Sequence, residues 1–247
     1  MNPLSKTKIK YIKSLQLKKY RLQEDKFIVE GRKSVSEFLS SDYTVEEVIG
    51  TKDFFKELDH YAHEVVNIVA SEKELGKLGS FKSNNAALAI VRMKHQSMVD
   101  LRPDEVALAL DSINDPGNLG TIIRIADWFG IENILISNNS VDVYNPKVVS
   151  ATKGSLTRVN VHFIDLPDYL ANYQGEVYAA YLNGTPLESL EPIESGIILM
   201  GSESHGIGED YLPHINHKVT ISGNGGAESL NVAVATGIMC HHLLKLA

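Results

Sequence analysis

The chain has 247 residues, a formal net charge of −7 and a single cysteine. That length supports one large domain or two modest ones, each with its own core. Because Cys240 is alone, an intrachain disulfide and a thiolate-rich zinc site are excluded. No apolar run reaches the roughly 18 residues of a membrane span, and the basic start lacks the hydrophobic stretch of a signal peptide. We therefore expect a cytoplasmic enzyme that uses neither a membrane nor a metal ion.

Positive charge is concentrated at the N-terminus. Residues 1–33 contain ten Lys or Arg and only three acidic residues. Such a density would hold phosphates through salt-dependent contacts, and it favours RNA as a partner. A solvated helix face that binds nothing accounts for the charge equally well. Under the RNA hypothesis, the expected contacts are Lys18, Lys19, Arg21 and Arg32.

The first part of the chain predicts a small α/β domain. A short strand at 27–29 is followed by a helix, and three more apolar runs read as strands. These runs are VEEVIG at 45–50, VVNIVA at 65–70 and AALAIV at 86–91. The polar segment 95–104 contains Pro103 and suits a linker. We therefore expect an N-terminal domain over 1–94.

The remainder, 105–247, alternates apolar strands with helical stretches. The expected strands lie at 106–110, 133–137, 177–182, 197–201 and 218–222. Fully apolar strands separated by helices are typical of a parallel sheet covered on both faces. The fold class is therefore α/β, with a parallel-sheet C-terminal domain.

The segment DSINDPGNLGTIIRIA at 111–126 joins the first of these strands to a helix predicted from about Leu119 to Phe129. Asn118 lies where a helix N-cap belongs, and capping is its plain structural role. Arg124 lies off the buried stripe of that helix, with small residues toward its N-terminus. A surface ion pair with Asp127 or with a neighbouring helix is the structural alternative for Arg124. Capping explains Asn118 but not Arg124.

Three common nucleotide signatures are missing. The turn P-G-N-L-G is not the G-x-G-x-x-G of dinucleotide folds, and position 137 is Ser rather than an acid. The chain also lacks the phosphate loop and the glycine-rich loop of ordinary Rossmann-type methyltransferases. NAD, ATP and the common adenosylmethionine pocket at the first strand are therefore disfavoured.

Two further segments place polar residues at strand ends. In LMGSESHGIG at 199–208, Glu203 could pair with Arg124 or cap the next helix. In ISGNGGAESLNVAVA at 221–235, Ser229 and Asn231 stand at the start of the last helix. Taken singly, each is best explained as a cap or turn residue. The three segments together indicate one site assembled from separate loops.

These segments resemble the three motifs of the SpoU (TrmH-like) branch of the SPOUT RNA 2′-O-ribose methyltransferases. The matching patterns are D-x-x-x-D-P-x-N-x-G-x-x-x-R-x-A at 111–126, G-x-E-x-x-G at 201–206 and S-L-N-V at 229–232. NPKVVSATKGSL at 145–156 and KKYRLQEDKFIVEG at 18–31 are also similar to parts of this family. The resemblance covers nearly the whole chain.

The resemblance implies a deep trefoil knot at the C-terminus, S-adenosylmethionine bound in a bent form within it, and a homodimer. It implies that Arg124 is the catalytic arginine and that four residues shape its centre: Asn118, Glu203, Ser229 and Asn231. Cofactor contacts fall on Gly201, Ile221 and Leu230, with Met200, Ile207 and Asn183 from adjoining loops. Because an arginine is normally protonated, we hypothesise that Arg124 engages an RNA phosphate and the ribose hydroxyl together.

The sequence departs from the family pattern in two places. Ile221 is followed by Ser222 and Gly223 rather than by P-M, and SFKSNNAALAIV lacks the T-P-Q-G that often precedes the last strand of the first domain. Ribosomal RNA is favoured over transfer RNA as substrate, because a separate basic domain suits the larger RNA. A base-modifying SPOUT methyltransferase and a catalytically silent RNA-binding protein are the alternatives.

Overall fold

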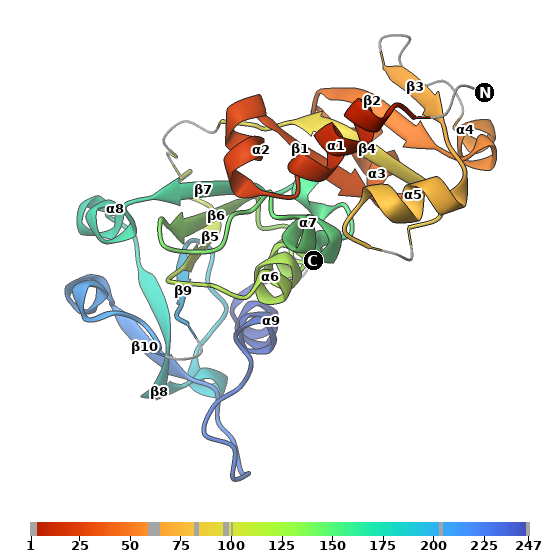
Figure 1. The fold of residues 1–247 in the computed structure, drawn as a ribbon. Helices are drawn as coiled ribbons and strands as arrows, with labels where there is room; N and C mark the ends of the chain where they lie inside the picture. The colour runs from red at the N-terminus through yellow and green to blue at the C-terminus, as the bar shows by residue number, and fades with distance from the viewer. Residues whose placement is uncertain are drawn as a thin grey trace. The chain divides into compact units, whose positions relative to one another are not determined.

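The computed structural model describes residues 4–58, 65–81, 84–95, 99, 101–202 and 205–245. The chain forms two compact units (Figure 1). Unit 1 comprises Met1–His95 and Asp142–Thr157, and unit 2 comprises Gln96–Val141 and Arg158–Ala247. Unit 1 thus contains the segment 142–157, which the sequence placed in the second domain. Part of the expected linker, 96–98 and 100, lies outside the described residues.

Unit 1 is built on a sheet with the strand order β1-β4-β2-β3. Its strands are β1 (Lys26–Glu30), β2 (Val45–Gly50), β3 (Val66–Val69) and β4 (Ala87–Arg92). All four predicted strands are present. Its helices are α1 (Lys6–Ser14), α2 (Lys18–Glu24), α3 (Arg32–Leu39), α4 (Lys52–Glu57), α5 (Glu72–Leu78), α7 (Pro146–Thr152) and the 3₁₀ turn η1 (Ser155–Thr157).

The two faces of this sheet have different cores. On one face, α1 and α5 pack Ile12, Leu15, Leu75 and Leu78 against the strands. On the other face, Phe27 of β1 packs against the rings of Phe38, Tyr43 and Tyr144. The Tyr144 ring lies 4.5 Å from that of Phe27, and its hydroxyl donates to the Lys94 carbonyl at 3.1 Å. The segment 142–157 therefore completes the aromatic core of unit 1.

Arg21 corrects one sequence expectation. We predicted an RNA contact, but the residue is 2% exposed. Its Nη2 donates to the Asp142 carboxylate at 2.6 Å, and its Nη1 donates to the carbonyls of Leu15 and Gln16 at 3.0 and 2.8 Å. A guanidinium that is buried and hydrogen-bonded in this way holds the protein together and has no surface to offer a phosphate.

Unit 2 contains a six-stranded sheet with the order β10-β8-β9-β5-β6-β7, in which every neighbouring pair is parallel. Its strands are β5 (Val106–Leu110), β6 (Asn133–Ser137), β7 (Asn160–Ile164), β8 (Val177–Pro186), β9 (Gly196–Met200) and β10 (His217–Thr220). The predicted parallel sheet is confirmed, and β7 is an additional strand. The helices are α6 (Pro116–Trp128), α8 (Leu166–Asn172), α9 (Val232–Leu243) and the 3₁₀ segments η2 (Leu187–Ser189) and η3 (Glu209–His214).

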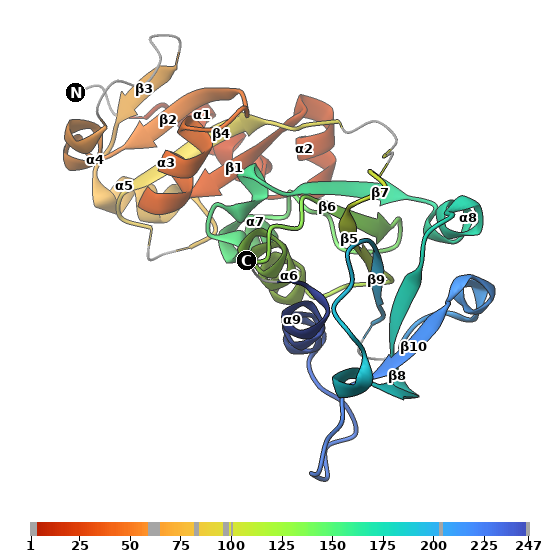
Figure 2. The same cartoon turned by 180° about the vertical axis from the view of Figure 1, so that it is seen from behind.

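Helices cover both faces of this sheet, as expected. α6 and α9 run side by side over one face in both views (Figures 1 and 2). On the other face, Leu166 and Leu170 of α8 and Tyr211 of η3 pack against Ala109 and Leu199 in one buried cluster. Cys240 is fully buried in α9, in keeping with a small apolar role. Within the described residues, no helix is long and apolar enough to cross a membrane.

Candidate active site

The three motifs follow β5, β9 and β10, and therefore start at the same edge of the parallel sheet. β5 and β9 are neighbours, with Leu110 paired to Met200. The pairing continues one residue further, because the Asp111 amide donates to the Met200 carbonyl at 2.9 Å. The carboxyl edge of an open α/β sheet, beside a switch in strand order, is where such folds bind ligands. The first two motifs thus begin in direct contact.

The start of α6 differs from the prediction. The helix begins at Pro116, and Asp115 is its N-cap, accepting from the Asn118 amide at 2.9 Å. Pro116 explains the earlier start, because a proline in the first helical position loses no hydrogen bond. Asn118 is therefore not the cap, and its side chain has another role.

That role joins the first motif to the third. The Asn231 side-chain amide donates to Asn118 Oδ1 at 3.0 Å. Asn231 Oδ1 also fills the structural alternative given above, because it caps α9 by accepting from the amides of Ala233 and Val234 at 3.0 and 3.3 Å. Residues 113 positions apart thus hold the N-termini of α6 and α9 together. Two helix N-termini at one place favour an anion, such as an RNA phosphate.

Arg124 lies on the exposed side of α6, two turns from this contact. The alternative ion pair between Arg124 and Asp127 is not formed. The Asp127 carboxylate instead accepts from Nε and Nη2 of Arg158 at 2.8 Å each. No ion pair joins Arg124 to another residue in the described ranges. Side chains lean toward the N-terminus of their helix, so the guanidinium can reach toward the loop at 111–118.

The loop after β9 is a tight backbone turn. Ser202 and Gly206 exchange two backbone hydrogen bonds of 2.9 Å. Gly201 faces this pair so closely that a Cβ would lie 2.2 Å from the Gly206 carbonyl carbon. Met200 is buried and Ile207 is half-buried. The loop therefore offers backbone groups and apolar side chains, while Glu203 lies outside the described residues.

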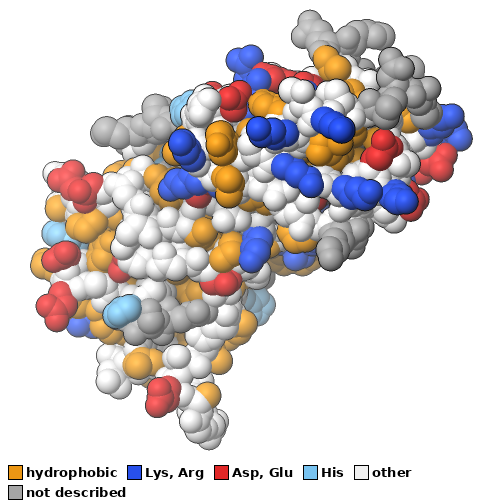
Figure 3. Space-filling model, viewed as in Figure 1, with side chains coloured by type: hydrophobic (Ala, Val, Ile, Leu, Met, Phe, Trp, Pro, Cys, Tyr) orange, Lys and Arg blue, Asp and Glu red, His pale blue; other side chains and the backbone are white. Residues whose placement is uncertain are grey.

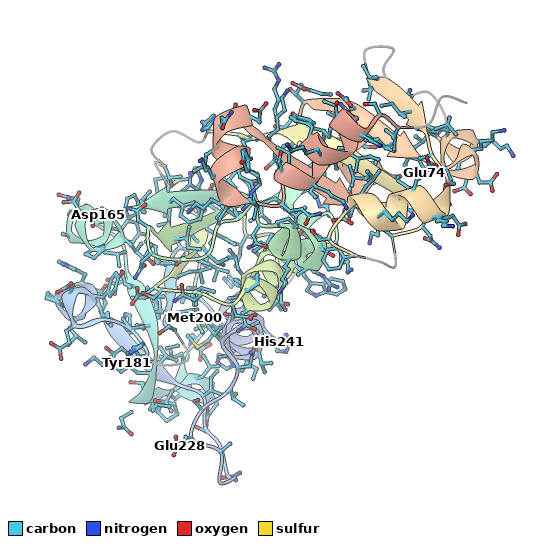
Figure 4. All side chains as sticks on the ribbon, viewed as in Figure 1. Glu74, Asp165, Tyr181, Met200, Glu228 and His241 are labelled. Atoms are coloured by element: carbon cyan, nitrogen blue, oxygen red, sulfur yellow. The ribbon has the colours of Figure 1, made fainter. Side chains whose placement is uncertain are left out.

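The third motif is on a projecting loop. Figure 4 shows Met200 beside α9 within unit 2, and Glu228 far out on the segment between β10 and α9. Ile221 is half-buried where this segment leaves the sheet, whereas Ser229 and Leu230 are exposed. Asn183 is also exposed, within the bulge by which β8 changes register against β10. The structure thus brings Asn118 and Asn231 into contact and leaves Ser229, Leu230 and Asn183 open to solvent.

Sequence reasoning gave no role to Asp111, although it begins the first motif. Its side chain is 6% exposed and accepts hydrogen bonds from the Gly208 amide at 3.0 Å and the Tyr211 hydroxyl at 3.1 Å. Burial, and then the Asp111 carboxylate, raise the pKa of Tyr211 above its ordinary value, so its hydroxyl keeps the proton that it donates. The sequence feature that could have indicated this role of Asp111 is its position, as an acidic residue directly after an apolar strand.

Comparison with known proteins agrees with this geometry. Residues 105–241 match the model of the SpoU rRNA Methylase family, and residues 6–89 match an MRM3-like substrate binding domain. A Bacillus subtilis protein named 23S rRNA (guanosine(2553)-2'-O)-methyltransferase RlmP is 30% identical over 96% of this chain and 95% of its own length.

Two solved structures are similar over almost the whole chain. A TrmH-family structure from Porphyromonas gingivalis has 33% identity and a TM-score of 0.89, covering 98% of this chain and 99% of that one. An AdoMet-bound rRNA methyltransferase from Sinorhizobium meliloti has 26% identity and a TM-score of 0.84, covering 99% and 98%. With its three motifs at one edge of a parallel sheet, this chain belongs to the SpoU rRNA methylase family.

Proposed function

We propose that this protein transfers the methyl group of S-adenosylmethionine to a ribose 2′-oxygen of ribosomal RNA. The observation that carries the proposal is the 3.0 Å contact between Asn118 and Asn231, which joins two motifs at the sheet edge where the third begins. The Bacillus subtilis relative, named as a 23S rRNA 2'-O-methyltransferase, supports the ribosomal substrate.

The residues at this edge fit the proposed cofactor. Adenosylmethionine presents an aromatic base, a ribose and a sulfonium, which need apolar walls and backbone hydrogen bonds. Ile207, Ile221 and Leu230 supply apolar surface, and Leu230, at 47% exposed, has surface for a ligand to cover. Gly201 and Met200 would supply the backbone, and Asn183 a polar contact from the β8 bulge. The AdoMet-bound relative from Sinorhizobium meliloti supports the same assignment.

Arg124 carries the proposed chemistry of this chain. When bound, the cofactor supplies an electrophilic methyl group, so the protein must present the 2′-hydroxyl in line with it and help remove its proton. Arg124 would hold an RNA phosphate and the hydroxyl together through its forked donors. The proton that the hydroxyl loses on methyl transfer would pass to that phosphate or to the guanidinium in its neutral form. Asn118 and Asn231 would fix the helix N-termini beside that phosphate, with Ser229 and Glu203 completing the centre. This chemistry uses no metal ion.

Unit 1 offers a basic surface for the RNA. Exposed lysines of α1 and α2 lie around Tyr20, Leu17 and Leu22, which are also exposed. Blue side chains gather over these helices in Figure 3. Phosphates would bind the lysines, and the apolar side chains would contact sugars or bases. We assign RNA contacts to Lys18, Lys19 and Arg32, the last of which would exchange its ion pair with Glu57 for a phosphate.

Charge reversal at Lys18 and Lys19 is expected to weaken RNA binding. Log affinity falls as log salt concentration rises, and the loss of two phosphate contacts should make this slope shallower by about 2. In turnover assays the KM for RNA should rise while kcat stays the same. Filter binding across a salt series measures the slope.

The matched control is K73E/K77E, which makes the same charge change on exposed lysines of α5, away from α2 in both views (Figures 1 and 2). Equal weakening in the two double variants would mean that only total charge matters, and it would remove α2 as the RNA surface.

An exposed apolar stripe supports a homodimer. Val234 and Ile238, one turn apart along α9, are 52% and 37% exposed, and Trp128 of the neighbouring α6 is 84% exposed. Apolar area of this kind favours burial against a partner. We propose that a second copy of this chain is that partner.

Val234→Glu with Ile238→Glu is expected to give monomers, because two charges would be buried at the interface. Light scattering after gel filtration reports the mass, and emission from Trp128, the single tryptophan, should shift to the red as it becomes solvated. Val66→Glu, at a residue 56% exposed on β3, is the control and should leave the mass unchanged. A wild-type protein that runs as a monomer would contradict the proposal.

We also propose the trefoil knot. Near the C-terminus, the Ile193 amide donates to the Leu243 carbonyl at 2.7 Å, and Ile193 bridges to Leu244. The end of the chain thus returns to the segment before β9, which supports threading of α9.

Since an rRNA substrate is found where ribosomes assemble, we propose a cytoplasmic location.

Mapping of methylated nucleosides tests the function. Ribosomal RNA from cells with and without this protein should differ by one 2′-O-methyl group, and the purified protein should restore it with adenosylmethionine. A methylated base would indicate a base-modifying enzyme, and a site in transfer RNA would correct the substrate. Adenosylmethionine that does not bind in calorimetry would indicate a silent RNA-binding protein.

A further inference from the structure

Two buried carboxylates stand at opposite ends of β5. Glu105 directly precedes the strand and Asp111 directly follows it, and each residue is 6% exposed. Buried carboxylates need hydrogen-bond donors. Glu105 finds them nearby, in the Asn133 side chain and the Arg102 amide. Asp111 finds two of its donors about a hundred residues away, in the segment that follows the β9 loop.

Asp111 holds both ends of that loop. Its backbone amide donates to the carbonyl of Met200, where the loop starts, at 2.9 Å. Its carboxylate Oδ2 accepts from the amide of Gly208, where the loop ends, at 3.0 Å. Oδ1 accepts from the hydroxyl of Tyr211, three residues further on, at 3.1 Å. One residue therefore clamps the turn 201–207 at its entry and its exit.

The clamp fixes the orientation of one backbone carbonyl. A peptide unit is planar, so an N–H that points toward Asp111 turns the carbonyl of the same unit away from it. The unit bound here joins Ile207 to Gly208. Its carbonyl belongs to Ile207, one of the residues proposed to contact the adenosyl group.

The carboxylate is itself held in place. The Ser112 hydroxyl donates to Asp111 Oδ1 at 2.7 Å and accepts from the Asn139 side chain at 2.8 Å. Ser112 has a φ of 57°, which is uncommon outside glycine, and its amide donates to Ser137 Oγ at 2.8 Å. These bonds join the loops after β5 and β6 and restrict the orientation of Asp111.

We propose that Asp111 is a positioning residue that preorganises the backbone at 200–202 and 206–208 for adenosylmethionine, and that it sets cofactor affinity rather than the rate of methyl transfer. The inference rests on the proposed function. It assigns to Asp111, the first residue of the first motif, a task that requires no contact with the RNA or the reacting atoms.

Two matched pairs of variants test this. Asp111→Ala is expected to raise the Kd and KM for adenosylmethionine about tenfold or more, with kcat within about threefold, since a hydrogen bond to a charged group is lost. Glu105→Ala removes the equally buried carboxylate at the other end of β5 and should leave that Kd unchanged. Asp111→Asn, whose amide oxygen can still accept from Gly208, should restore most of the affinity.

The second pair changes the contact from the side of Gly208, whose φ of −61° suits proline. Gly208→Pro removes the donor and puts a ring carbon where the hydrogen points at Asp111, so it breaks the contact. Gly208→Ala keeps the N–H, and its Cβ would lie 3.3 Å from the Tyr211 ring. The proline variant should resemble Asp111→Ala and the alanine variant the wild type, so the pair gives an answer even if Asp111→Ala does not fold.

Hydrogen exchange supplies a readout independent of activity. The Gly208 amide should exchange faster in Asp111→Ala than in the wild type or in Glu105→Ala. Wild-type affinity for adenosylmethionine in both Asp111→Ala and Gly208→Pro would overturn the inference while leaving the proposed function intact. If the wild type does not bind adenosylmethionine in calorimetry, the proposed function fails, and the inference fails with it.

Discussion

Replacing Arg124 with alanine is expected to lower the rate of methyl transfer at least about a hundredfold, the lower range for losing a group that assists proton transfer. Affinity for adenosylmethionine should change by less than about threefold, because the proposed cofactor contacts lie on other loops. Single-turnover methylation of RNA, beside calorimetric titration with the cofactor, separates the two effects. Arg124→Lys should also be severely impaired, since an ammonium lacks the fork that engages phosphate and hydroxyl together.

Arg158→Ala is the control for this experiment. The substitution removes an arginine of unit 2 that pairs with Asp127, a residue of α6 like Arg124. The rate of methyl transfer in this variant should stay within about twofold of the wild type. Full activity in Arg124→Ala would remove that residue from the mechanism. A parallel loss of cofactor affinity would instead assign it to the adenosylmethionine site.

Removing Arg21 is expected to cost unit 1 about 3–5 kcal/mol of stability, because Arg21→Ala leaves the Asp142 carboxylate in a mostly buried place without its partner. The carbonyls of Leu15 and Gln16 lose a donor as well. Arg21→Lys should recover little, since one ammonium cannot replace the forked guanidinium. Urea unfolding, with hydrogen exchange of the β1 and β4 amides to report on unit 1 alone, measures the loss.

Lys56→Ala is the comparison for the buried pair. Lys56 and Asp53 form an ion pair within unit 1 whose side chains are 74% and 77% exposed, and its loss should cost at most about 1 kcal/mol. Equal losses in Arg21→Ala and Lys56→Ala would mean that burial of the Arg21 pair contributes nothing. RNA binding that weakens in Arg21→Ala without a loss of stability would restore Arg21 as an RNA contact.

The parallel sheet of unit 2 was largely predictable because strands buried on both faces are continuous apolar runs. The runs 106–110 and 133–137 coincide with β5 and β6. β7 was missed because its sequence, NVHFI, includes Asn160 and His162. His162 is nevertheless only 9% exposed, since its Nε2 lies 3.0 Å from the Asn133 side chain.

Arg21 and Asn118 were misjudged for a common reason. A count of charges treats Arg21 as surface, but its burial depends on Asp142, which is 121 residues away. Asn118 and Asp115 are both good caps, and only Pro116 in the first helical position decides between them. Composition and local pattern carry no information about partners so distant, whereas the motif order was enough to predict that Asn118 and Asn231 share a site.

The segment 142–157 limits how this protein can be recombined with its relatives. Val148 and Val149 are buried in unit 1, although the SpoU family match spans them. A chimera joined at residue 95 would leave the grafted N-terminal part of unit 1 without the Tyr144 ring and the Asp142 carboxylate. It would also leave the buried side chains of α7 in the recipient without the sheet that they pack against. A working graft must carry both pieces of unit 1 and therefore needs three junctions instead of one.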